Sequence, residues 1–249
     1  MYRKRKKKLT KLGRRLFYLL LLFSLVLSVV CLYNLYSHYK SYEEGEKTYS
    51  EISLSNEENV TVESKYDSLK KINKDYIGWL TLEGTVIDYP IVQGSDNEYY
   101  LEHLFDGKEN HMGCIFIDYE NKNTFEDKNT FLYGHHTNTG SMFCILENYK
   151  DQNFYNNHKE FTLETENKKY KIKPFAGILV KGNESFIQLS FESNDSFMDY
   201  VRKIRKQSIF ESPVTVKPSD KLVTMVTCTD DFYDARLALF CVLEEENML

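Results

Sequence analysis

The sequence predicts a mostly β protein: a closed eight-stranded β-barrel with an N-terminal helix and a helix before the last two strands, preceded by one transmembrane helix. Two observations predict this fold. From residue 78 the chain is a series of short β-branched and aromatic runs separated by Gly, Asn and Asp. Residues 16–36 contain no charged side chain, and a helix of these 21 residues spans roughly 30 Å, the thickness of a bilayer's hydrocarbon core.

The uneven distribution of charge orients the predicted membrane helix. The first fifteen residues contain nine basic side chains and no acidic one, whereas the remaining 23 basic and 37 acidic residues give the rest of the chain a net charge of −14. Basic residues before the span and Glu43, Glu44 and Glu46 after it place the N-terminus in the cytoplasm and the rest outside the cell.

Two alternatives for the N-terminal segment are less favoured. A basic tail can bind nucleic acid, but the apolar run directly behind it favours a membrane, so we expect no nucleic-acid partner. A cleaved signal peptide is the other alternative. The apolar run is long for one, and no clear small-residue cleavage site follows it. We therefore expect an uncleaved signal anchor and a single-pass protein of the cell membrane.

The chain accordingly divides into four parts. We expect a cytoplasmic basic tail at 1–15, a transmembrane signal anchor at 16–36, a polar extracellular stalk at 37–62 and one folded domain at 63–249. The domain begins with an amphipathic helix over 63–77, which we expect to pack on the domain as a lid. The apolar positions of this helix are Tyr66, Leu69, Ile72 and Ile77.

The barrel strands follow in order. We expect them at 79–84, 86–92, 114–118, 129–134, 160–165, 169–182, 221–228 and 236–243. Short helices are expected at 141–149 and 151–158. A longer helix is expected over 195–210, with Asp195 or Ser196 as its N-cap. Its apolar stripe consists of Phe197, Tyr200, Val201, Ile204 and Ile209.

The five cysteines do not indicate a metal site. Cys31 lies in the predicted membrane span, which leaves four outside, enough for two disulfides. Cys114, Cys144 and Cys241 each lie inside an apolar run, so we expect buried free thiols there. The chain has no CxxC pair, and the acidic loop 118–127 lacks the spacing of an EF-hand. We expect no metal and no cofactor.

The residues around the last loop suggest chemistry. Cys228 ends one strand and Arg236 begins the next, so the two face each other if the strands pair. A thiol is a useful nucleophile only as thiolate, which a nearby cation favours. His135 or His136, after Gly134 at a strand end, supplies a base. Arg236 and the backbone N–H of Thr229 could stabilise an oxyanion. These are the parts that acyl transfer needs.

Simpler interpretations exist for each of these residues. Cys228 could be a small core residue, the histidine a turn residue, and Arg236 the partner of a nearby aspartate. The aspartates available in the loop are Asp230, Asp231 and Asp234. The protein would then be a non-catalytic extracellular barrel that binds peptides. A secreted cysteine hydrolase that uses water as acceptor is a further alternative.

Four separated segments resemble one known family, in the same order. The segment TMVTC at 224–228 resembles the TLxTC signature of sortases, with Met225 in the Leu position and Arg236 eight residues after the cysteine. LYGHHT at 132–137 resembles the strand-end Gly-His of that family. Residues 78–103 and 112–118 resemble the opening of class B sortases, although Cys114 replaces a usual Ser. A helix before the cysteine strand is also a class B feature. The resemblance covers about residues 65–245.

The resemblance implies a cysteine transpeptidase of Gram-positive cell surfaces. Cys228 would attack the Thr carbonyl of a C-terminal sorting motif, NPQTN-like or PxTG-like, on a secreted protein substrate. His135, rather than His136, would protonate the leaving amine of the thioester-forming step. An amine of a peptidoglycan precursor would then accept the acyl group. The resemblance leaves the exact motif and acceptor open.

Further residues around these groups are candidates for binding, and one of them, Asp230, resembles an acid of some class B sortases. Candidates for oxyanion or substrate binding are Thr227, Thr229, Tyr133 and Asp230, and Asp230 could orient Arg236.

Overall fold

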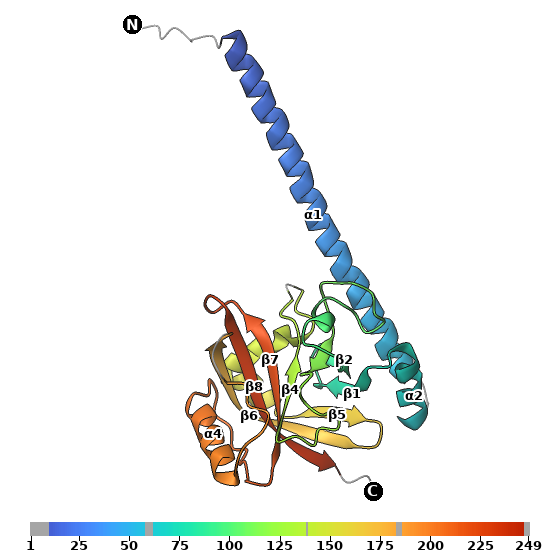
Figure 1. Cartoon of the computed structure of the whole chain (residues 1–249), viewed down its shortest axis with the longest axis vertical. Coiled ribbons are helices and arrows are strands. Elements are labelled where there is room, and N and C mark those ends of the chain that lie inside the picture. The colour runs from blue at the N-terminus through green and yellow to red at the C-terminus, as the bar shows by residue number, and fades with distance from the viewer. Residues whose placement is uncertain (1–9, 58–61, 138, 183–185, 247–249) are drawn as a thin grey trace.

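The structure is a computed structural model. It describes residues 10–57, 62–137, 139–182 and 186–246, with the side chains of 54–57 and 62–64 excepted. Figure 1 shows a barrel with one long helix that leaves it and extends far beyond it.

Eight strands form the predicted closed barrel. They are β1 (Tyr76–Thr81), β2 (Asp88–Val92), β3 (Ile115–Ile117), β4 (Asn129–Tyr133), β5 (Phe161–Thr165), β6 (Lys169–Lys181), β7 (Lys221–Thr229) and β8 (Ala235–Glu246). Around the barrel the order is β1-β2-β3-β4-β7-β8-β6-β5. Pairing is antiparallel except for β2 with β3 and β4 with β7, which run parallel. The expectation of a closed eight-stranded barrel is confirmed.

Strands β7 and β8 are buried on both faces, which explains their nearly continuous apolar sequence. One face packs into the main core with Val223, Met225, Leu237 and Leu239. The other face contributes to a second core cluster that also contains residues of α4 (Asn194–Lys206). The α4 residues buried in that cluster are Phe197, Tyr200, Val201 and Ile204. A helix over 195–210 was expected, and it is shorter at its C-terminal end.

The N-cap of α4 differs from the expectation. Ser193, and not Asp195 or Ser196, caps the helix, and its hydroxyl accepts a hydrogen bond from the backbone N–H of Ser196. The Ser196 hydroxyl receives a bond in return from the backbone N–H of Ser193, at 3.1 Å. This reciprocal pair is a capping box. The helix begins at Asn194, one residue before the expected start, so Ser196 is its third residue.

Helix α2 (Val62–Ile72) is shorter than expected, because the chain from Tyr76 joins the barrel as β1. Leu69 is buried, as expected, but Ile72 is about half exposed, and Ile77 is buried in the strand. The helix packs beside β1, where Lys70 Nζ donates to the backbone carbonyl of Tyr76. The two short helices after β4 are present as η2 (Phe143–Lys150) and α3 (Gln152–Asn157).

Three of the cysteines were expected to be buried free thiols. Cys114 and Cys241 are fully buried and free, and burial raises the pKa of the Cys114 thiol to about 12. Cys144 is free but only partly buried, because it lies on η2 near the barrel rim. Neither buried thiol is a candidate nucleophile, because desolvation disfavours the thiolate.

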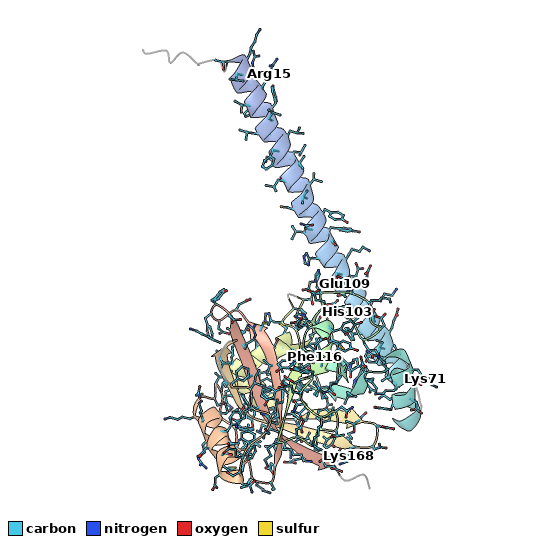
Figure 2. The ribbon with its side chains drawn as sticks, viewed as in Figure 1. Arg15, Lys71, His103, Glu109, Phe116 and Lys168 are labelled. Carbon is cyan, nitrogen blue, oxygen red and sulfur yellow. The ribbon has the colours of Figure 1, made fainter. Side chains whose placement is uncertain are left out.

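Helix α1 (Lys11–Glu57) is long and apolar enough, by length and composition, to cross a membrane. Figure 2 shows its side chains projecting freely on all sides between Arg15 and the barrel. The helix continues through most of the segment 37–62, which we expected to be a stalk. Gly45, Tyr49 and Ile52 are buried there against the barrel. They lie at helical spacing on one face of α1. This short buried stripe is hard to recognise in the sequence, because the residues around it are polar. The four-part division of the chain stays a prediction.

Polar contacts fasten this part of α1 to the barrel. The hydroxyl of Tyr49 donates to the backbone carbonyl of Gly113 at 2.6 Å. Asn110 donates to the carbonyl of Ser41 at 2.7 Å, and the Ser141 hydroxyl donates to Glu46 at 3.1 Å. The last contact reaches the loop after β4. Helix α1 is thus part of the folded domain for its last turns.

We expect Tyr49→Phe to destabilise the domain by about 1 kcal/mol, because a buried carbonyl loses its donor while the ring stays packed. The measurement is urea unfolding of a fragment that starts at residue 37 and keeps these contacts. Tyr39→Phe, at an exposed position of the same helix, is the matched control and leaves stability unchanged. Equal stability of both variants would contradict the contact.

Candidate active site

The pairing of β7 with β8 brings the thiol and the guanidinium together. Cys228 and Arg236 are directly opposite each other in the antiparallel register, so their side chains project from the same face. Cys228 is exposed, although β7 is otherwise buried from Leu222 to Thr229. The thiol is therefore at the barrel rim and accessible, which excludes the simple interpretation that it is a core residue.

The parallel pairing of β4 with β7 places His135 at the same level. Tyr133 is opposite Val226, and the N–H of Gly134 donates to the carbonyl of Val226 at 3.2 Å. His135 follows Tyr133 by two residues, and Cys228 follows Val226 by two residues. The two therefore leave neighbouring strands at one height of the barrel.

The His135 ring is held by the loop that precedes β3. Its Nε2 lies 2.5 Å from the backbone carbonyl of Leu101. Gly113 packs against the ring, and a Cβ at this position would lie 2.9 Å from His135 Cδ2. Gly113 also has a φ of +62°, which favours glycine. A bulkier residue there would displace the imidazole, so the sequence of this loop fixes the position of the ring.

These side chains share one cleft of about 280 Å³ at the rim. It is lined by Asn97, Leu101, Phe116, Tyr133, Gly134, His135, Val226, Thr227, Cys228 and Arg236. Somewhat larger hollows lie elsewhere, for example one of about 360 Å³ beside Lys168, but no cysteine or histidine lines that hollow. Helix α2, expected to act as a lid, contributes no described residue to the cleft. The cleft at the rim is therefore the place for the chemistry.

Arg236 is oriented by a different acid from the one we expected. Its Nη1 lies 3.0 Å from Oδ1 of Asp234 and donates to the carbonyl of Ala235 at 3.1 Å. Asp234 has a left-handed backbone conformation, with φ of 57°, that turns the chain into β8. Asp230 is exposed in the same loop. The acid that orients Arg236 is thus Asp234 and not Asp230.

The two threonines that flank Cys228 have different surroundings. Thr227 is buried and lines the cleft, and its hydroxyl has no hydrogen-bond partner among the described residues. Thr229 is also buried but points to another group of residues. Its hydroxyl bonds to the carboxylates of Glu147 and Asp231 and accepts from Lys150. The proposed contribution of the Thr229 backbone N–H to an oxyanion hole stays a prediction.

A charged cluster surrounds Thr229 behind the cleft. The pKa of Asp231 lies below its usual value, because Lys150 and Thr229 donate to its carboxylate. Burial alone would raise the pKa of Glu147, but hydrogen bonds from Thr229 and Lys150 outweigh it, and the pKa is lowered. His136 Nε2 lies 3.3 Å from Glu147 Oε2. His136 therefore belongs to this cluster and not to the cleft, which supports the choice of His135.

Asp118, which sequence reasoning missed, supports the opposite wall of the cleft. It is buried and directly follows β3. Its Oδ2 accepts hydrogen bonds from the hydroxyl of Tyr133 at 2.7 Å and from Asn97 at 3.1 Å. Burial and this carboxylate raise the pKa of Tyr133 well above its usual value. The available sequence signal for Asp118 was a polar residue at the end of an apolar strand. The carbonyl of Leu101, which contacts His135, gave no sequence signal.

An accessible cysteine that shares a barrel-rim cleft with a histidine and an arginine defines the protein as a cysteine enzyme equipped for acyl transfer. The chain belongs to the sortase family: the profile of the sortase domain matches residues 80–244. It is 37% identical over 186 residues to Sortase B of Listeria monocytogenes, an alignment that covers 75% of this chain and 76% of the relative. It is 32% identical to Sortase B of Staphylococcus aureus, over 77% and 78% of the two chains.

Solved structures agree. A Staphylococcus aureus sortase B–substrate complex superposes with a TM-score of 0.77 at 28% identity, over 84% of this chain and all of the other. Clostridium perfringens sortase B gives a TM-score of 0.68 at 34% identity, over 72% and 98% of the chains. The resemblance to class B sortases is confirmed, and the protein is a sortase B-type cysteine transpeptidase.

We expect Asp118 and Tyr133 to be energetically coupled. Tyr133→Phe removes a hydrogen bond to a buried carboxylate and costs about 1.5–3 kcal/mol of unfolding free energy. In the Asp118→Ala background the same change costs at least about 0.5 kcal/mol less. Urea unfolding of the single and double variants measures the coupling. A second cycle, which combines Asp118→Ala with Tyr39→Phe, is the control and should show additive costs. If the costs of Asp118→Ala and Tyr133→Phe were additive in the double variant, the hydrogen bond between the two residues would contribute nothing to stability.

The charged cluster predicts a pH-dependent contribution to stability. Carboxylates whose pKa is lowered by folding stabilise the protein above their unfolded pKa, about 4, and lose this contribution as the pH falls. Lys150→Met removes their common cation. We expect the variant to be less stable at pH 7 and to lose less stability on acidification below about pH 4. Urea unfolding across this pH range tests it, with Lys159→Met on an exposed loop as control; identical pH profiles of the K150M and wild-type proteins would contradict it.

Proposed function

We propose that Cys228 is the nucleophile, His135 the general acid and base, and Arg236 the cation that stabilises the oxyanion. The observation that carries this proposal is the shared register of β4, β7 and β8, which brings the three side chains to one cleft. Arg236 keeps its charge at any relevant pH and offers several donors. Its ion pair with Asp234 holds it beside the thiol and uses only some of its N–H donors.

The reaction proceeds in two acyl transfers. The Cys228 thiolate attacks the carbonyl carbon of the Thr in the sorting motif, and the oxyanion that forms faces Arg236. The C–N bond then breaks, His135 gives its proton to the leaving amine, and a thioester remains. An incoming amine attacks the thioester, His135 takes its proton, and the thiolate leaves.

The Leu101 carbonyl gives the imidazole a defined role. A backbone carbonyl only accepts hydrogen bonds, so Nε2 of His135 carries a hydrogen in this arrangement. Nδ1 is then the nitrogen that gains and loses the transferred proton. The same carbonyl stabilises the imidazolium, because the bond strengthens when the ring is charged.

Two solved relatives support the proposed substrates. One solved relative is described as a sortase B–substrate complex, and another as sortase B complexed with a peptide of three glycines. For this chain we propose secreted proteins with a C-terminal NPQTN-like or PxTG-like sorting motif, cut after Thr, as acyl donors. The acceptor is an amine of a cell-wall precursor. We propose that the hydroxyl of Thr227, a cleft residue whose hydroxyl has no partner among the described residues, forms one hydrogen bond with the bound motif.

Helix α1 is proposed to anchor the enzyme. Its apolar part has the length and composition of a membrane span, and it joins the barrel without a break. The basic tail keeps the N-terminus in the cytoplasm. The barrel then lies outside the cell, where its substrates are.

Substitution of the three proposed catalytic residues tests the assignment. We expect Cys228→Ala and His135→Ala to abolish detectable cleavage of sorting-motif peptides, and Arg236→Ala to lower kcat by about 10²–10³-fold, the cost of losing an oxyanion donor. The assay uses residues 37–249 with a panel of motif peptides. Cys144→Ala, a partly buried thiol outside the cleft, is the matched control and stays active. Full turnover by the C228A protein would end the proposal.

Product analysis separates transpeptidation from hydrolysis. Mass spectrometry of the wild-type enzyme with peptide is expected to show a thioester adduct on Cys228. Adding an amine such as triglycine should convert the product from free acid to amide and raise the turnover. If turnover and product are the same with every amine offered, the enzyme is a hydrolase.

A further inference from the structure

The loop between β7 and β8 exposes two aromatic side chains beside the cleft. Tyr233 is 95% exposed, more than any other large hydrophobic side chain among the described residues, and Phe232 is 40% exposed. The loop joins Cys228 to Arg236, and no described residue covers its tip. Two adjacent exposed aromatic rings at a catalytic rim suggest a contact with a partner, because tyrosine and phenylalanine bury large apolar areas when they find one.

The carboxylates of the same loop are turned toward the barrel. Asp231 pairs with Lys150, and Asp234 pairs with Arg236. Only Asp230 of the three remains exposed without an ion pair among the described residues. The loop tip therefore presents aromatic rings with little free charge, a composition that fits the headgroup region of a membrane better than an acidic or basic protein surface.

Contacts of α1 show how near the membrane lies. The uncharged run ends at Tyr36, and His38 already stacks on His111 of the barrel, with ring centroids 4.8 Å apart. At 1.5 Å per residue, His38 is only about 3 Å along the helix beyond Tyr36. Ser41 follows with its bond from Asn110. The loop of residues 109–113 therefore lies at the membrane surface if α1 spans the bilayer.

The catalytic rim faces the same way. Figure 1 shows the β7–β8 loop at the end of the barrel toward the free part of α1, whereas α4 and the C-terminal end of β8 lie at the opposite end. Figure 2 shows His103 and Glu109 where α1 meets the barrel, and Lys168 far from that junction. The continuous helix and its contacts with the barrel keep this orientation, because no described break separates them.

We propose that the tip of the β7–β8 loop contacts the outer surface of the membrane, with Phe232 and Tyr233 among the lipid headgroups. This proposal rests on α1 being the membrane anchor. The loop then forms a second point of contact and orients the cleft toward the bilayer. Acyl donors and amine acceptors that are themselves held at the membrane meet the thiol at that surface. Exposed Asp230 limits the contact to the headgroup region.

Fluorescence in lipid nanodiscs tests the contact. Full-length Tyr233→Trp protein is reconstituted in phosphatidylcholine discs with or without acyl chains brominated near the headgroup. We expect bromine to reduce its added emission about twofold, the result of a ring within reach of the interface. Wild-type protein, whose single Trp79 is buried, supplies the background. Asp199→Trp, at an exposed position of α4 at the far end of the barrel, is the matched control and is not quenched.

The outcomes distinguish the two proposals. Co-elution of the protein with the discs, together with unquenched Y233W emission, would reject the loop contact and leave the anchor intact. Failure of the wild-type protein to remain with the discs would reject the anchor itself. Quenching of Y233W and D199W alike would show that the barrel has no fixed orientation, which also rejects the contact.

Discussion

The pairing of β7 with both of its neighbours is the constraint on which the site depends. Parallel pairing with β4 sets the level of His135, and antiparallel pairing with β8 sets Arg236 opposite Cys228. Side chains alternate along a strand, so a slip of one residue would turn the thiol to the other face. Burial of β7 and β8 on both faces makes such a slip costly, because the side chains of each face are packed into their own core cluster. The relative positions of His135, Cys228 and Arg236 are thus secured by hydrophobic packing.

Around this frame, three side chains of the cleft are each held by a neighbouring group. The Leu101 carbonyl holds His135, Asp234 holds Arg236, and Asp118 holds Tyr133. These partners fix orientation and do not react themselves. Such a supporting layer reduces the reorganisation needed during the reaction.

Helix α1 contacts the loops around the same site. Tyr49 bonds to the carbonyl of Gly113, and Gly113 packs directly against the ring of His135. Glu46 accepts a bond from Ser141 on the loop after β4. The helix that carries the apolar run therefore also supports the loops around His135. Through these contacts, residues 41–53 of α1 are part of the folded domain, although their polar composition predicts a stalk.

The sequence by itself determined the strands, the closed barrel and the apolar run, which periodicity and composition record. It indicated the trio of His135, Cys228 and Arg236 through local motifs that resemble those of sortases. Only the tertiary structure decided that Asp234 and not Asp230 holds Arg236, that Asp118 supports the cleft and that residues 37–57 continue α1. The first choice depends on the turn that Asp234 makes into β8, and the others depend on contacts between distant segments and on backbone carbonyls such as that of Gly113. A carbonyl is present at every position, so its role leaves no trace in the sequence.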